Sequence, residues 1–82
     1  VKRTGRDRFV RNVLVAVGNS GDAGLAAVAQ ARLDDASPLV RGAAIWALSR
    51  LVPEATFAQL RALREPLETD PGVREEWMSV FP

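Results

Sequence analysis

The sequence contains neither cysteine nor histidine. Without cysteine the chain cannot form disulfides, present a thiol nucleophile, hold cysteine-ligated iron–sulfur clusters or build the usual zinc sites. Without histidine it lacks the commonest general base at neutral pH and the usual partner of a catalytic serine. A chain without cysteine also fits a reducing compartment, so we expect a cytoplasmic protein. We therefore expect no catalytic residue, bound cofactor or metal site within this chain.

Long apolar runs are missing as well. No stretch is long enough to cross a bilayer, and no charged-then-apolar signal segment is present, so we expect no membrane partner. The 82 residues are 48% hydrophobic and 26% charged, values typical of a folded globular domain. Because so short a chain buries a limited core, we expect a single domain of modest stability over residues 1–82.

Charge is distributed unevenly although the net charge is only +1. Residues 1–11 contain five cationic side chains and one acid, Asp7, whereas the other residues carry more acids than bases. The five are Lys2, Arg3, Arg6, Arg8 and Arg11. Such a segment can bind the phosphates of a nucleic acid, or it can simply be a solvated helix end.

An internal repeat organises the chain. The pair Val-Arg occurs at Val10-Arg11, Val40-Arg41 and Val73-Arg74, at intervals of 30 and 33 residues. Apolar residues follow the first two copies at offsets of three, four and seven from the valine, which is the pattern of one helix face. We predict an all-α fold of HEAT-like, armadillo-type helical hairpins, with repeats over about 5–34 and 38–67 and a partial repeat over 71–82.

Turn and capping signals place the helix ends. Ser37-Pro38 and Asp70-Pro71 each combine an N-cap side chain with a proline in the first turn. Asp22 and Pro53 mark two further starts, Thr4 with Asp7 resembles a capping box, and Asn19 is predicted to be a left-handed turn residue. The predicted helices span 5–18, 22–34, 38–52, 54–66 and 71–80, with no strand. The third is apolar on most sides and should be central.

Several side chains have a structural explanation and a functional one. We expect Arg41 and Arg74 to pair with an aspartate of the preceding turn, and Trp46 and Trp77 to pack rather than to stack on RNA bases. Capping and solvation explain the acidic residues better than metal binding or acid–base catalysis does. These acids are Asp34, Asp35, Glu65, Glu68 and Asp70.

Two segments resemble known families. Residues 33–48, with their aspartate, Val40-Arg41 pair and spaced alanines, resemble a HEAT-type repeat. Residues 2–22 resemble the start of the C-terminal HEAT-like domain of epoxyqueuosine reductase. The matching elements are Lys2-Arg3, Arg11-Asn12 and Gly18-Asn19-Ser20-Gly21-Asp22. This resemblance covers residues 2–51 well and the rest loosely.

The resemblance implies a parent enzyme that reduces epoxyqueuosine to queuosine in tRNA. Such an enzyme uses cobalamin and two [4Fe-4S] clusters, held by upstream catalytic domains that would be partners of this chain. We therefore expect a noncatalytic domain, excised from the C-terminus of the enzyme, that helps to bind or position tRNA through its basic N-terminal helix. The five cationic side chains are the candidate phosphate contacts, and Asn12 is a candidate contact for a ligand or a partner domain.

The alternative is a HEAT-repeat scaffold for protein–protein or interdomain contacts, without a nucleic-acid role. It gains if Arg3, Arg6 and Arg8 pair with acids, and loses if they form an open surface patch.

Overall fold

The computed structural model describes residues 3–80, and this range is helical, without a strand. The α-helices within it are α1 (Arg3–Asn19), α2 (Ala26–Ala31), α3 (Pro38–Leu51), α4 (Glu54–Arg64) and α5 (Pro71–Ser79). Two short 3-10 helices, η1 (Ala23–Leu25) and η2 (Glu65–Leu67), precede α2 and follow α4. The predicted all-α class is confirmed.

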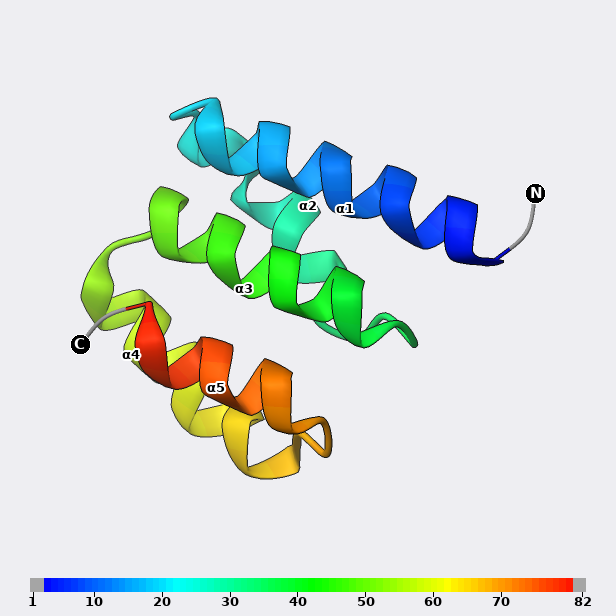
Figure 1. The fold of residues 1–82 in the computed structure, drawn as a ribbon. Coiled ribbons are helices and arrows are strands. Elements are labelled where there is room, and N and C mark those ends of the chain that lie inside the picture. Colours follow the sequence, from blue (N-terminus) through cyan, green and yellow to red (C-terminus); the bar gives the residue numbers. More distant parts are fainter. Residues whose placement is uncertain (1–2, 81–82) are drawn as a thin grey trace.

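The helices form two layers. Helices α1, α3 and α5 lie side by side with α3 in the middle, and all three run in the same direction (Figure 1). Helices α2 and α4 lie behind them and return the chain from one member of the first layer to the next (Figure 1). The molecule measures 38 × 29 × 18 Å, so it is a slab about two helices thick.

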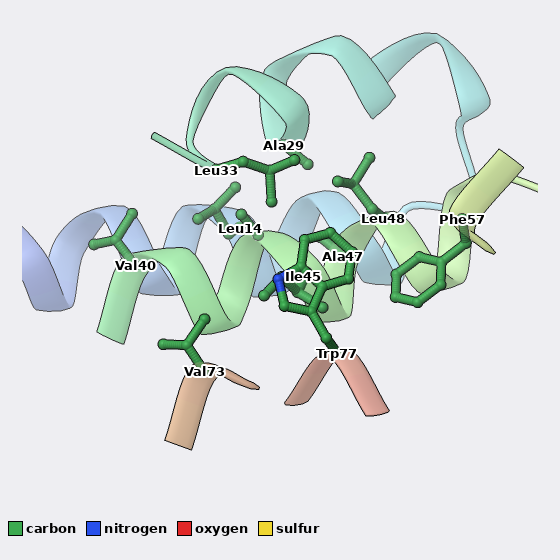
Figure 2. Packing of buried hydrophobic residues seen from close by; sticks show 11 residues of the cluster. Leu14, Ala29, Leu33, Val40, Ile45, Ala47, Leu48, Phe57, Val73 and Trp77 are labelled. Atoms are coloured by element: carbon green, nitrogen blue, oxygen red, sulfur yellow. The ribbon is translucent and has the colours of Figure 1, made fainter. Parts of the chain in front are cut away.

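Helix α3 is the centre of the core. Its buried side chains Val40, Ile45 and Leu48 meet side chains from α1, α2, α4 and α5 (Figure 2). From α5, Trp77 points toward α3 and is 2% exposed, and its ring centroid lies 5.2 Å from that of Phe57 on α4. Trp77 is therefore a core residue, as the packing interpretation predicts.

Gly18 allows the end of α1 to approach α3 closely. A Cβ atom at this position would lie 2.5 Å from Cζ3 of Trp46 and 3.1 Å from the Cα of Ala47. The Trp46 ring is also approached by Arg50, whose guanidinium carbon lies 5.5 Å from the ring centroid. Trp46 is thus half-buried between helices.

The two ends of α1 differ from the prediction. Helix α1 begins at Arg3, so Thr4 and Asp7 lie inside the helix and form no capping box. Asn19 is the last residue of α1, and the left-handed conformation is taken instead by Gly21, with φ of 69°. Glycine has no Cβ and adopts positive φ at little steric cost, whereas the Cβ of asparagine makes that conformation less favourable.

The predicted helix over 22–34 is divided into η1 and α2. Asp22 does act as an N-cap, but for η1, where its carboxylate accepts a hydrogen bond from the N–H of Gly24 at 2.8 Å. Asp70 caps α5 as predicted, accepting from the N–H of Val73 at 3.0 Å. Ser37 occupies the N-cap position of α3, but its hydroxyl makes no capping bond.

Candidate nucleic-acid interface

The outward side of α1 carries polar side chains, and the carboxylate at its edge, Asp7, is bonded to Arg6. Thr4, Arg8, Arg11 and Asn12 follow one another at spacings of four, three and one residues, which places them on the same side of a helix. Thr4, Arg8 and Asn12 are exposed, and Arg11 is half-buried. No carboxylate among the described residues pairs with Arg8 or Arg11. We call Thr4, Arg8, Arg11 and Asn12, together with Asn19, the polar face of α1.

Arg11 and Asn12 form a single hydrogen-bonding unit within this face. The Nε of Arg11 donates to Oδ1 of Asn12 at 2.9 Å. Because Oδ1 accepts this bond, the amide nitrogen of Asn12 and the terminal guanidinium nitrogens of Arg11 remain available as donors. Arginine and asparagine donors of this kind are the groups that bind phosphate and sugar oxygens in nucleic-acid complexes.

Asn19 extends the polar face to the end of the helix. It is exposed and lies seven residues after Asn12, so the two amides are on the same side of α1. Sequence reasoning interpreted Asn19 only as a turn residue. The seven-residue spacing is the signal that would have joined it to this face.

Arg6 lies apart from the polar face and is paired with two acids, and its role as a phosphate contact stays a prediction. Its terminal nitrogens donate to both carboxylate oxygens of Asp35, at 2.9 and 2.7 Å, and to Oδ1 of Asp7 at 3.0 Å. The Asp35 side chain is 5% exposed. Hydrogen bonds from Arg6 lower the pKa of Asp35 to about 2, and those same bonds raise the pKa of Arg6. Arg6 thus joins α1 to the turn before α3.

Two of the candidate cations lie outside what the structure describes. Lys2 precedes the described residues, and Arg3 is described only in its backbone, as the first residue of α1. Their predicted role as phosphate contacts stays a prediction. Of the five cations near the N-terminus, Arg8 and Arg11 are those that the structure places on the polar face.

The junction made by Asp35 is repeated 33 residues later by Glu68. Asp35 accepts a bond from the N–H of Ser37 at 2.9 Å, and Glu68 accepts one from the N–H of Asp70 at 2.9 Å. Each carboxylate also receives two bonds from an arginine of the preceding first-layer helix, Arg6 for Asp35 and Arg41 for Glu68. Hydrogen bonds from Arg41 lower the pKa of Glu68. Both acids bond to a backbone N–H, as the capping prediction requires, but they are nearly buried in ion pairs rather than solvated.

The partners of Arg41 and Arg74 differ from the prediction. Arg41 pairs with Glu68 of the following turn, at 3.0 and 2.8 Å, and reaches the preceding turn only through the carbonyl oxygens of Asp35 and Ala36. Because α3 lies between the two turns, one guanidinium can bond to both. Arg74 does pair with the preceding turn, but its partner is Glu65 rather than an aspartate.

Within residues 3–80, no group of three or more histidine, cysteine, aspartate or glutamate side chains is arranged to hold a metal ion. Asp34 pairs with Arg64 of α4. In the same range, none of the helices combines the length and the apolar character needed to cross a membrane.

Comparisons with protein-family models, with curated proteins and with solved structures give no match to this chain.

Proposed function

We propose that this chain is a noncatalytic HEAT-like domain of an epoxyqueuosine reductase, and that it helps to hold tRNA through the polar face of α1. The parent would reduce epoxyqueuosine to queuosine in tRNA. In this proposal the chain supplies binding and orientation, and the catalytic domains of the parent are its partners.

The helix arrangement supports a HEAT-like repeat. Parallel first-layer helices, joined by second-layer helices behind them, are what stacked helical hairpins produce. The paired junctions of Asp35 and Glu68, 33 residues apart, give successive repeats the same contact. A repeat scaffold does not specify a function, so the tRNA role must be argued from its surface.

The observation that carries the tRNA proposal is the composition of the polar face of α1. It presents two arginines without carboxylate partners, flanked by exposed amide and hydroxyl groups. The one acid described in α1, Asp7, lies three residues after Thr4 and four before Arg11, at the edge of this face, but its side chain is 14% exposed and pairs with Arg6. A surface that offers cations and neutral donors, with its neighbouring carboxylate already paired, is suited to a phosphate backbone.

The iron–sulfur clusters of such a parent do not fit this chain. It has no cysteine to supply thiolate ligands and no histidine to replace them. The clusters would therefore be held by other parts of the parent enzyme, and no step of the reduction is assigned to residues of this chain.

A titration of the chain with a tRNA anticodon stem-loop at several salt concentrations tests the proposal. The double variant Arg8→Gln with Arg11→Gln should bind more weakly. The slope of its log affinity against log salt concentration should be smaller in magnitude by about one for each lost phosphate contact. Arg61→Gln, which removes one cation from α4, is the matched control and should bind like the unmodified chain. Unchanged affinity in the double variant would show that the polar face is not the RNA contact.

The scaffold for protein contacts is the second candidate. It is favoured by the pairing of Arg6 with Asp35, because that pairing removes a cation from the predicted RNA surface. If the stem-loop does not bind the unmodified chain at low salt, the scaffold explanation replaces the RNA one.

A further inference from the structure

A shallow trough runs over the outer side of α3, between α1 and α5. Its volume is about 620 Å³. The floor is mainly apolar and includes Leu39, Gly42 and Trp46 of α3, with Val15 of α1 beside them. Leu39 is 44% exposed and Val15 is 37% exposed, so apolar surface in the trough remains in contact with water.

Small side chains make the trough hollow. A Cβ atom built on Gly42 has no neighbour within 4 Å, so a larger side chain there would extend into open space. Leu39, Gly42 and Trp46 are spaced by three and four residues, which forms a stripe about 10 Å long on α3. A stripe of that length accepts about two turns of another helix.

The two walls carry opposite charges that have no partner charge among the described residues. Arg11 lines the wall on α1, and its printed hydrogen bond goes to the neutral side chain of Asn12. Glu76 lines the wall on α5 and is half-buried. Burial, assisted by the neighbouring charge of Glu75, raises the pKa of Glu76. A partner that brings a cation to this wall and an anion to the other would compensate both groups.

A protein helix fits these features better than other ligands. The trough is open along its length, whereas pockets for small molecules enclose most of the ligand. The wall at α5 includes the carboxylates of its N-cap, Asp70, and of Glu76, which would repel the phosphates of a nucleic acid. An amphipathic helix instead combines an apolar stripe with charged flanks.

We propose that this trough binds an amphipathic α-helix of a protein partner. Its apolar stripe would lie on Leu39, Gly42 and Trp46, with a carboxylate flank toward Arg11 and a cationic flank toward Glu76. This site shares Arg11 with the tRNA proposal, but its floor on α3 and its wall at α5 lie outside the polar face of α1.

The test uses a synthetic helical peptide of about 18 residues, a length at which helix formation becomes practical. It carries leucines at helical spacing, with glutamates along one flank and lysines along the other. A peptide of the same composition in scrambled order is the control. Binding to the 82-residue chain is followed by the indole N–H signals in heteronuclear NMR. The Trp46 signal should shift on binding, while that of the buried Trp77 should move much less.

Two protein variants make the result specific. Gly42→Phe should weaken peptide binding by about tenfold because it fills the trough, whereas Gly42→Ala should leave it within about twofold. Both should fold, because each replaces glycine in a helix by a better helix former. Glu76→Gln should weaken peptide binding severalfold and leave stem-loop RNA binding unchanged. Arg8→Gln should weaken RNA binding and leave peptide binding unchanged.

Several outcomes would overturn the proposal. Equal binding of the scrambled peptide would show that the stripe is not recognised, and equal binding by Gly42→Phe would place the peptide elsewhere. A Trp46 shift produced by the RNA but not by the peptide would assign the trough to nucleic acid.

Discussion

The two sides of α1 use arginine in different ways. Arg6 and Arg8 are two residues apart, a rotation of about 200° around the helix, so they point in nearly opposite directions. Arg6 faces the turn before α3 and bonds to both oxygens of a nearly buried Asp35. Arg8 is exposed and has no carboxylate partner among residues 3–80. One arginine holds two elements together, and the other remains available for a ligand.

This difference shows why a count of cations overstates a binding surface. The basic segment at the N-terminus is a property of the sequence, but helix geometry divides it. An arginine that already makes two bonds to a carboxylate has little free energy to gain from a phosphate. The inward side of α1 should therefore control stability and the outward side should control binding.

Truncating core side chains of α1 should give the largest difference between its sides. Leu14→Ala should lower the free energy of unfolding by about 3 kcal/mol, because Leu14 is 1% exposed and its loss leaves a cavity. Phe9→Ala should change it by less than about 0.5 kcal/mol, since Phe9 is 69% exposed. Urea unfolding followed by circular dichroism measures both. Similar losses in the two variants would mean that the outward side is also packed.

The Asp35 junction should give the next largest effect. Asp35→Ala removes the acceptor of the Arg6 bonds and of the Ser37 N–H, so it should destabilise the chain by about 2 kcal/mol. The adjacent Asp34 is 77% exposed and pairs with Arg64 alone, so Asp34→Ala should cost about 0.5 kcal/mol. Equal costs at the two positions, measured by urea unfolding, would contradict the structural role given to Asp35.

Two glycines of the first layer should respond in opposite directions to alanine. Gly18→Ala should destabilise by about 1–2 kcal/mol, because the new methyl group would collide with Trp46 and the backbone of Ala47. Gly42→Ala should stabilise by about 0.5–1 kcal/mol, since its methyl group meets no neighbour and alanine favours the helix. Thermal unfolding distinguishes them, and a gain at Gly18 would contradict the close approach of α1 to α3.

Acid should gradually weaken the two junctions made by Asp35 and Glu68. The pKa of Asp35 falls to about 2 in the folded chain, and that of Glu68 is also lowered, so both lie below the values of about 4 expected when unfolded. The unfolded state then binds more protons, and the contribution of these carboxylates is complete above about pH 5 and lost toward pH 2. Asp35→Asn should flatten this acid-dependent loss. Parallel curves of unfolding free energy against pH for the unmodified chain and Asp35→Asn, between about pH 5 and pH 2, would contradict this role of Asp35.

Much of the fold could be predicted from the sequence because it depends on local patterns. The repeated Val-Arg pairs and the proline-containing caps place the starts of α3 and α5 at the correct residues. Apolar residues cover most sides of α3, and this pattern correctly identifies it as the central helix. The division of the second helix into η1 and α2 was not predicted, since helical periodicity does not distinguish a 3-10 turn from an α-helical one.

The candidate site could be predicted only in part, because pairing depends on tertiary contacts. Arg6 and Asp35 are 29 residues apart, and nothing in the local sequence of either residue indicates their contact. The same holds for Arg41, whose partner Glu68 lies in the following turn instead of the preceding one. The trough over Gly42 was also missed, because a hollow depends on the spacing of three helices that are distant in the sequence.

The central claim, that the two sides of α1 have separate roles, is tested most directly by comparing Arg6→Gln with Arg8→Gln. For each variant, urea unfolding and binding of the tRNA anticodon stem-loop are measured under the same conditions. We predict that Arg6→Gln lowers the urea midpoint and leaves the RNA affinity of the folded chain unchanged. Arg8→Gln should leave the midpoint unchanged and weaken RNA binding. Loss of RNA affinity in both variants, or in neither, would contradict the account.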